Sequence, residues 1–597
     1  MSHFSLNLSP DGDLVYQGEM LQDKTAIVRY GQTDRLIIVL LGRIYYQSDL
    51  EKRFNLRADI TLDLIAELYL KCGEKALAHL EGEFALVIGD RQEKRLILCR
   101  DPMGNYPLYW RENSSGIIVS SRLKTLVAGE ENRLNDHYLA QYLSYSFAFT
   151  ELPKTETIYP HCYRLLPGQI LQLQTGKKTH LLFQQNLLDN LIPISDITPQ
   201  EAGEKFRALL SQAIEERCQF GKTGAHLSGG MDSSGVVCLA SQKYALTTLS
   251  LVYTLKTLAQ ETDYIQLILD QCPDLNSVFV DGDRLVDFQW FDQPLPDHDE
   301  PYAGLFHLAI ERVLAQKAAD LGLNMVLTGS GAEIVAEANH YGLADQLRQG
   351  DWQGVLQKSQ QWAIASNQNR WTILSEYAFK PLLPSWLRFS PSTVFHQGVG
   401  RWPNLGSYEI APWINAQFRQ DQHLWSINRG LINQLSIAPI EQSLDKLALS
   451  CLAGVWANWS LNNPLGIHIA QPFLDPRLIQ FCLALPDSIR DQPGIKKPLM
   501  QSAFADILPT KILHRKYKDN FNEPYWKGLN QNLDGLKQLV RQSPFSQGDS
   551  NSPIFNSEIL IDCLEKHAVG IGDISSGSHL CRALALMAWN DKARSGA

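Results

Sequence analysis

The residues of this chain that are best suited to chemistry form a short run rich in glycine and serine. The run reads Ser228-Gly229-Gly230-Met231-Asp232-Ser233-Ser234, between an apolar strand pattern at residues 225–227 and a helical pattern at 234–240. Such a turn presents unpaired backbone N–H groups and the positive end of a helix dipole, which favour a phosphate or pyrophosphate. Asp232 adds a carboxylate that can hold Mg²⁺ against phosphate oxygens. The order strand, loop, helix therefore predicts a site for nucleotide phosphates.

This run is not the phosphate loop of common NTPases. That loop needs the pattern G-x-x-x-x-G-K-[ST], with a Lys that reaches the phosphates, and no Lys lies within residues 228–234. The nearby Gly221-Lys222-Thr223 does not complete the pattern, because Glu216 stands where its first glycine is required. We therefore expect a different class of nucleotide-binding loop.

The heptad resembles the pyrophosphate loop of ATP pyrophosphatases, which cleave ATP to AMP and pyrophosphate and so adenylate a substrate. The chain around it is similar to the asparagine-synthetase-type synthetases within that group. The resemblance implies an α/β domain of the adenine-nucleotide α-hydrolase type that uses ATP and Mg²⁺. It implies that ATP and its pyrophosphate are bound by Leu227, Ser228, Gly229, Gly230, Asp232, Ser233, Ser234, Ser250, Gly329 and Gly331.

A second glycine-rich turn follows the apolar strand pattern at residues 325–328. It reads Gly329-Ser330-Gly331-Ala332-Glu333-Ile334, where the family carries a turn followed by Asp-Glu. Glu333 can still offer oxygens to a hard cation, so Asp232 and Glu333 are the expected metal ligands. Ile334 cannot bind a metal and departs from the family pattern.

The resemblance also implies catalytic and substrate-binding residues. The family pattern places a catalytic Lys at Lys518 and a second basic group at Lys497. A compact ammonium can neutralise charge that builds on the α-phosphate and on a tetrahedral oxyanion. Four further residues match stretches that line the nucleotide and substrate cleft, namely Glu261, Tyr264, Glu300 and Tyr302.

The first 185 residues have a different pattern of predicted secondary structure. They are predicted to form strands at 35–41, 84–89, 95–100, 116–120 and 169–173, and helices at 61–72 and 135–144, which is an α+β pattern with sheets as the main element. Residues 80–88 and 100–109 resemble the glutamine-hydrolysing domain of class II amidotransferases, an Ntn-hydrolase-type sandwich. Residues 41–45 fit a further strand of that fold, and residues 166–169 match its last hairpin.

Glutamine hydrolysis in that family needs a cysteine directly after the initiator Met, and the free α-amine of that cysteine serves as the base. This chain begins Met1-Ser2-His3, and a Ser hydroxyl is a far weaker nucleophile. We therefore expect a retained scaffold that releases no ammonia, so that the amine for any condensation comes from the substrate.

The predicted organisation is multidomain: a degenerate glutamine-amidotransferase-like domain at 1–185, a linker at 186–199, and a synthetase domain at 200–597. The sequence Thr198-Pro199-Gln200-Glu201 is typical of a helix start. Helices at 204–218, 263–272 and 306–322 alternate with strands at 246–253, 276–280 and 325–328. This alternation predicts a parallel sheet that binds ligands at the carboxyl ends of its strands. The remainder is expected to be mostly helical.

Composition excludes several classes of protein. The net charge of −10 argues against a general nucleic-acid binder. The longest strongly apolar run, residues 36–41, is far too short to span a bilayer, and no secretion signal is evident. The ten Cys residues are scattered singly, which indicates reduced core thiols in a cytoplasmic protein.

Within the family, the chain looks most like the lasso-peptide cyclases. These enzymes adenylate an Asp or Glu side chain of a precursor peptide, and the peptide's N-terminal amine then attacks to close a macrolactam. The resemblance rests on residues 515–524 and on the late helical stretch at 581–589. It implies a precursor peptide as substrate, with a leader-binding protein and a leader peptidase of the same pathway as partners.

Other functions remain open. They are a β-lactam-synthetase-like or asparagine-synthetase-like amide ligase, a tRNA-thiolating ATP pyrophosphatase, and a non-catalytic adapter that binds a peptide or protein. The tRNA-thiolating class would need reactive Cys pairs and a basic face, and the sequence suggests neither. The departure at Glu333-Ile334 motivates the adapter hypothesis, which predicts no Mg²⁺-dependent nucleotide binding.

Overall fold

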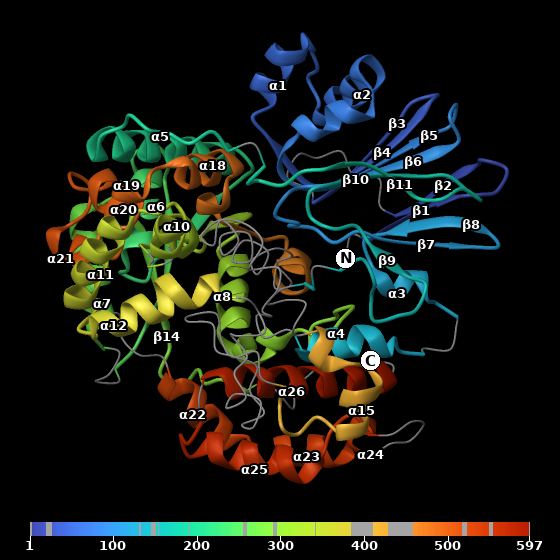
Figure 1. The fold of residues 1–597 in the computed structure, drawn as a ribbon. Helices are drawn as coiled ribbons and strands as arrows, with labels where there is room; N and C mark the ends of the chain where they lie inside the picture. The colour runs from blue at the N-terminus through green and yellow to red at the C-terminus, as the bar shows by residue number, and fades with distance from the viewer. Residues whose placement is uncertain are drawn as a thin grey trace.

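The structure is a computed structural model of the 597-residue chain. It describes residues 3–18, 27–129, 133–144, 151–152, 154–189, 191–254, 259–289, 295–338, 340, 342–383, 410–427, 458–515, 522–547, 553–572 and 574–595. Figure 1 shows two layered sheets near the N-terminus, a region of strands surrounded by helices, and a group of helices from the C-terminal part of the chain. Across those ranges, no helix is both long and apolar enough to cross a membrane.

Two stacked antiparallel sheets form the N-terminal half. One has the strand order β2-β1-β8-β7-β9 and the other β11-β10-β6-β5-β4-β3. Their bounds are β1 Phe4–Leu8, β2 Leu14–Gly18, β3 Val28–Gln32, β4 Leu36–Tyr45, β5 Glu81–Asp90, β6 Arg95–Arg100, β7 Tyr109–Asn113, β8 Gly116–Ser120, β9 Tyr163–Arg164, β10 Gln169–Leu173 and β11 His180–Gln184. The predicted α+β sandwich is confirmed.

Burial on both faces explains the continuous apolar run at residues 36–41 of strand β4. Leu36, Ile38 and Leu40 pack against helices α1 (Gln47–Phe54) and α2 (Thr61–Cys72). The intervening residues 37, 39 and 41 face the core between the two sheets. A strand that is buried on both faces needs apolar side chains at every position, so this run lies within the core.

Two local predictions in this half hold with changed boundaries. Residues 41–45 lie in a strand, as predicted, but they continue the strand predicted at 35–41 to form β4, in which Gly42 adopts a φ of +84° and a Cβ would lie 2.0 Å from the Glu83 carbonyl oxygen. Residues 166–169 lead from β9 into β10, whose first residue is Gln169, and the β10–β11 hairpin extends to Gly168, whose carbonyl accepts a hydrogen bond from the Gln185 N–H at 2.8 Å. In both places a glycine allows the backbone a conformation that the strand pattern does not reveal.

The second half contains the predicted parallel sheet. Its order is β14 (Asn276–Asp281), β13 (Thr247–Val252), β12 (Thr223–His226), β15 (Met325–Leu327) and β16 (His468–Ala470), and every neighbouring pair is parallel. Helices α6 (Met231–Ser241), α7 (Ala259–Gln271) and α8 (Leu308–Asp320) connect the first four strands. Strand β16 was not predicted, because three residues that follow β15 by some 140 positions carry no periodic pattern.

Helix α5 (Pro199–Cys218) begins five residues before the predicted start at 204. Its cap is the expected one: the Thr198 side chain accepts a hydrogen bond from the Glu201 N–H, and the Glu201 carboxylate accepts one from the Thr198 N–H. This reciprocal capping box satisfies two otherwise unpaired donors, so the cap rather than the apolar periodicity sets the helix start.

The remaining described elements are mostly helical, as predicted. They are η1 Glu74–His79, α3 Leu123–Leu126, α4 Asp136–Ser144, η2 Ala303–His307, α9 Ala332–Val335, α10 Gly342–Arg348, α11 Trp352–Ser366, α12 Arg370–Ile373, η3 Leu374–Phe379, η4 Lys380–Leu382, α15 Ala416–Asp421, η5 Asn458–Asn462, η6 Asn463–Leu465, η7 Pro472–Leu474, α18 Pro476–Ala484, α19 Asp487–Arg490, α20 Pro498–Ala503, α21 Thr510–Leu513, α22 Asn522–Gln531, α23 Leu533–Gln542, α24 Pro544–Gln547, α25 Ser557–Ala568 and α26 Ile574–Ser595. The long α26 packs beside α4 (Figure 1), so the C-terminal helices share a core with the N-terminal half.

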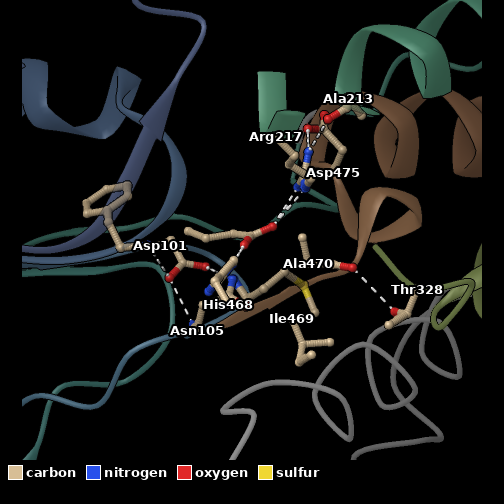
Figure 2. Close-up of polar contacts among 12 residues, drawn as sticks. Asp101, Asn105, Ala213, Arg217, Thr328, His468, Ile469, Ala470 and Asp475 are labelled. Atoms are coloured by element: carbon tan, nitrogen blue, oxygen red, sulfur yellow. Dashed lines mark hydrogen bonds and ion pairs between the residues drawn. The ribbon is translucent and has the colours of Figure 1, made fainter. Parts of the chain in front are cut away.

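A buried polar network joins the two halves. Arg217 of α5 lies 2.8 Å from Glu83 of β5 and 3.1 Å from Asp475, which caps α18. His468 of β16 contacts the other oxygen of Glu83, and the Tyr106 hydroxyl lies 2.9 Å from the His468 Nδ1. Figure 2 shows Arg217 directed at Asp475 and His468 lying in the same network.

Burial opposes the charged form of Glu83, but Arg217 and His468 outweigh it and lower the pKa of Glu83 to about 2. Burial lowers the pKa of His468, so the neutral ring can donate its Nε2 hydrogen to Glu83 while Nδ1 accepts the Tyr106 hydroxyl. Because the Glu83 pKa is depressed in the folded protein, its stabilising effect is present above about pH 4.5 and is lost as the pH falls toward about 2.

Arg217→Met is expected to lower the free energy of unfolding by about 3–5 kcal/mol, because it leaves two carboxylates buried without their guanidinium. Chemical unfolding at pH 7 measures this loss. The matched control is Arg207→Met on the same helix, whose Arg207–Asp506 pair is solvent-exposed and should be worth less than about 1 kcal/mol. Equal losses in both variants would contradict the role given to Arg217.

Candidate nucleotide-binding site

The run of glycine and serine forms the predicted turn between a strand and a helix. Strand β12 ends at His226, Gly230 caps α6, and α6 begins at Met231. Gly230 has no side chain to bond the first-turn N–H groups of the helix. Those groups therefore remain available to an anion, beside the positive end of the helix dipole.

Hydroxyl groups of the turn stabilise its shape. The Ser233 Oγ accepts a hydrogen bond from the Ser228 N–H at 3.2 Å and lies 3.0 Å from the Ser228 Oγ. Ser234 and Ser250 are buried, and neither hydroxyl oxygen has a hydrogen-bond partner among the described residues. Leu227 is also buried, but its N–H extends the sheet by donating to the Leu249 carbonyl. The described residues thus leave both serine hydroxyl groups without a hydrogen-bond partner.

Glycine is required at two positions by close packing. Gly229 has a φ of +69°, and a Cβ there would lie 2.7 Å from the Cβ of Tyr264 on α7. At Gly329, which follows β15, a Cβ would lie 2.6 Å from the Ser233 backbone nitrogen. The turn after β15 therefore packs directly against the N-terminus of α6, so the structure brings together the two glycine-rich turns singled out from the sequence.

Lys497 supplies positive charge at this helix end. Its Nζ lies 2.6 Å from the Asp232 Oδ1, and its side chain is only 8% exposed while that of Asp232 is 28% exposed. Lys497 immediately precedes α20, whose first residue is Pro498. The predicted second basic group and the predicted metal ligand are therefore neighbours, and both lie where phosphate charge would bind.

The two expected metal ligands can be tested against this geometry. Asp232 keeps one oxygen beside Lys497, and Glu333 accepts a hydrogen bond from the Gly331 N–H at 3.1 Å. Over the described ranges, no group of three His, Cys, Asp or Glu side chains is arranged to hold a metal. Mg²⁺ is commonly bound by one or two carboxylates together with substrate phosphates, so these residues suit a metal that arrives with ATP.

Arg515 is a site residue that the sequence analysis did not assign. Its guanidinium forms a two-pronged ion pair with Glu261, with one N–O distance of 3.1 Å, and lies 4.0 Å from the centre of the Tyr264 ring. Tyr264 in turn packs on Gly229. Arg515 therefore connects the segment before Lys518 to the turn at residues 228–234, which we call the phosphate loop after its predicted ligand. Its place at the start of a basic run was visible, but its acidic partner lies 254 positions away.

The structure places the other two predicted cleft residues at the interface between the halves. Glu300 pairs with Arg164 and accepts a hydrogen bond from the Ile158 N–H at 3.2 Å. Tyr302 is buried beside Leu305 and Leu461. Both line a cavity of about 60 Å³ that Arg100, Tyr109, Tyr138 and Glu151 also border. They thus lie beside residues of the N-terminal half, whereas Tyr264 packs on Gly229 and Glu261 pairs with Arg515. Lys518 lies outside the described residues.

Fold and site together define an ATP-binding synthetase domain joined to an amidotransferase-like domain, and comparison with known families agrees. A glutamine amidotransferase domain model matches residues 28–184, and an asparagine synthase model matches residues 205–447 and 460–591. The second match alone covers more than half of the chain. The protein belongs to the asparagine synthetase family, whose members are ATP-dependent ligases that form amide bonds.

Individual relatives are distant. The chain is 28% identical over 345 residues to putative asparagine synthetase [glutamine-hydrolyzing] 2 of Methanocaldococcus jannaschii, a match that covers 55% of this chain and 64% of that protein. It is 23% identical to asparagine synthetase [glutamine-hydrolyzing] 1 of Bacillus subtilis, over 93% of this chain and 85% of that one. A third relative is amidase chry2 of Gibberella zeae, which is 25% identical over 63% of this chain and 58% of its own length.

Gly329→Ala is expected to weaken Mg·ATP binding about tenfold, equivalent to about 1.4 kcal/mol, because the new methyl group would press on the Ser233 N–H. Isothermal titration calorimetry measures the dissociation constant. Gly535→Ala is the matched control, since a Cβ there meets nothing within 4 Å. Unchanged affinity in Gly329→Ala would show that phosphate binds elsewhere.

Proposed function

We propose that this protein is an ATP-dependent amide ligase that adenylates a carboxylate and then joins it to an amine. The observation that carries the proposal is the uncapped N-terminus of α6, which Gly329 approaches and beside which Lys497 lies buried. Family membership supports the same reaction class. The products are the amide, AMP and pyrophosphate.

The chain's own groups have distinct tasks in the first step. The N–H groups at the start of α6 bind the β- and γ-phosphates, and the Lys497 ammonium offsets negative charge on the departing pyrophosphate. A carboxylate oxygen of the substrate attacks the α-phosphorus. The bond between the α-phosphorus and the oxygen that bridges to the β-phosphate breaks, and pyrophosphate leaves. Asp232 and Glu333 would hold Mg²⁺, which supplies further positive charge to the phosphates when bound.

In the second step the amine attacks the acyl carbon and AMP leaves with the bonding electrons. Water would destroy the acyl-adenylate, so the site must exclude it. The rate of attack increases most for an amine that belongs to the same bound molecule, because its attack is effectively unimolecular. We assign Lys518 to the developing oxyanion of this step, by resemblance to the family.

The finer proposal is a lasso-type precursor peptide as substrate. An Asp or Glu side chain would be adenylated, and the peptide's N-terminal amine would close the macrolactam, with a leader-binding protein and a leader peptidase acting in the same pathway. Of the two stretches that support it, residues 581–589 lie in α26, where Leu584 and Trp589 are buried in the shared core. That stretch serves packing, so support rests on residues 515–524. Met1 and Ser2, on which the absence of glutamine hydrolysis was predicted, lie outside the described residues.

The deciding experiment incubates the protein with Mg·ATP and candidate leader-trimmed peptides and follows mass and nucleotide products. Loss of one water from the peptide, with one AMP formed per ring, is expected. A parallel reaction contains aspartate with ammonia or glutamine. Asparagine formation there, with unmodified peptides, would favour an asparagine-synthetase-like ligase. The adapter hypothesis gains if neither reaction proceeds and Mg·ATP does not bind.

Lys518→Ala is expected to lower turnover by about 10²–10³, the usual cost of removing one group that stabilises a developing anion. Initial rates of AMP formation at saturating ATP measure the effect. The control is Lys511→Ala, which removes a positive charge that is nearby in the sequence and exposed on α21. The rate of AMP formation by this variant should equal that of the wild type. Turnover of Lys518→Ala within about threefold of wild type would remove Lys518 from the mechanism.

A further inference from the structure

Two cysteines that are far apart in the sequence lie side by side in the synthetase half. Cys238 is on α6, Cys272 directly follows α7, and their sulfur atoms are 3.6 Å apart. The sequence indicated reduced core thiols and did not predict this contact, because 34 positions separate two residues that the fold brings together. Nine cysteines lie among the described residues, all of them free thiols, and Cys72 is exposed rather than buried.

The two thiols differ in environment. Cys238 is 3% exposed, whereas Cys272 is partly exposed and so accessible to small molecules. The hydrogen bond between the two thiols lowers the pKa of Cys272 and raises the pKa of Cys238. A lowered pKa favours the thiolate, the form of a cysteine that reacts with oxidants. By contrast, burial raises the pKa of Cys482 to about 12.

We propose that Cys238 and Cys272 form an oxidation site for peroxides, and that the resulting disulfide weakens the nucleotide site. The Cys272 thiolate attacks one peroxide oxygen, the O–O bond breaks, and hydroxide leaves to become water, which gives a sulfenic acid. The Cys238 sulfur then attacks the Cys272 sulfur and displaces hydroxide, which takes up the Cys238 proton. Two thiols and one hydrogen peroxide thus give one disulfide and two waters.

Geometry links this bond to the phosphate loop. A disulfide needs its sulfur atoms about 2.05 Å apart, against 3.6 Å in the structure, so bond formation draws the two cysteines together. Helix α6 begins at the loop, and α7 carries Tyr264, whose Cβ would be 2.7 Å from a methyl group on Gly229. Packing this close leaves no room for α7 to shift without disturbing the loop. The effect on nucleotide rests on the proposed function; the disulfide does not.

The test treats the full-length protein with a small excess of hydrogen peroxide at pH 7. Peptide mapping without reductant is expected to show one cross-link, between Cys238 and Cys272, that dithiothreitol removes. Neither Cys238→Ser nor Cys272→Ser should form it, whereas Cys72→Ser should form it as wild type does. Cross-links elsewhere, or Cys272 oxidised to sulfinic acid without a cross-link, would overturn the disulfide site.

Mg·ATP titration of reduced and oxidised protein tests the second half of the proposal. Oxidation should raise the dissociation constant at least fivefold, dithiothreitol should restore it, and Cys272→Ser should be unaffected by peroxide. Equal affinity of both forms would overturn the coupling to the loop. If the reduced protein itself fails to bind Mg·ATP, the proposed function and the coupling fall together, while the cross-link map still decides the disulfide site.

Discussion

The structure of the site depends on one constraint, the uncapped N-terminus of α6. A helix start leaves its first N–H groups without intrahelical partners, and a start without a side-chain cap can bind another acceptor. Gly230 provides no cap, and Gly329 allows the neighbouring turn to approach the same N–H groups. Only small groups fit around this point, which keeps its positive potential available to an anion.

The turn that contains Gly329 lies beside the start of α6 because β15 and β12 are neighbours in the sheet. Gly329 follows β15, the neighbour of β12, and the Thr328 N–H donates to the Ala470 carbonyl at the end of β16 (Figure 2). His468, at the other end of β16, contacts Glu83 of the N-terminal half. A single short strand therefore connects the interface between the halves to the turn beside the phosphate loop. This arrangement gives the amidotransferase-like half a structural task that is independent of glutamine chemistry.

The charged groups divide into two sets according to burial. Glu83, Arg217 and Asp475 satisfy one another away from solvent, which makes the interface specific because each buried charge requires its partner. Asp232 and Lys497 form a pair that is partly open to solvent, so an incoming phosphate can compete for the ammonium. Similar ion pairs thus join the two halves at one place and, under the proposed function, bind the ligand at the other.

Local sequence determined the elements whose information is short-range. Strands β6, β8 and β10 and helix α2 have the predicted bounds, because alternating or helical apolar patterns with flanking turn residues decide them within a few positions. The phosphate loop was likewise predictable, since strand, glycine-rich turn and helix are contiguous. Tertiary structure alone decided β16, the Arg515–Glu261 pair, the meeting of Cys238 with Cys272, and the burial of Glu300 against Arg164. Each joins residues far apart in the chain, and no local pattern reports which distant side chain will satisfy a buried charge or complete a sheet.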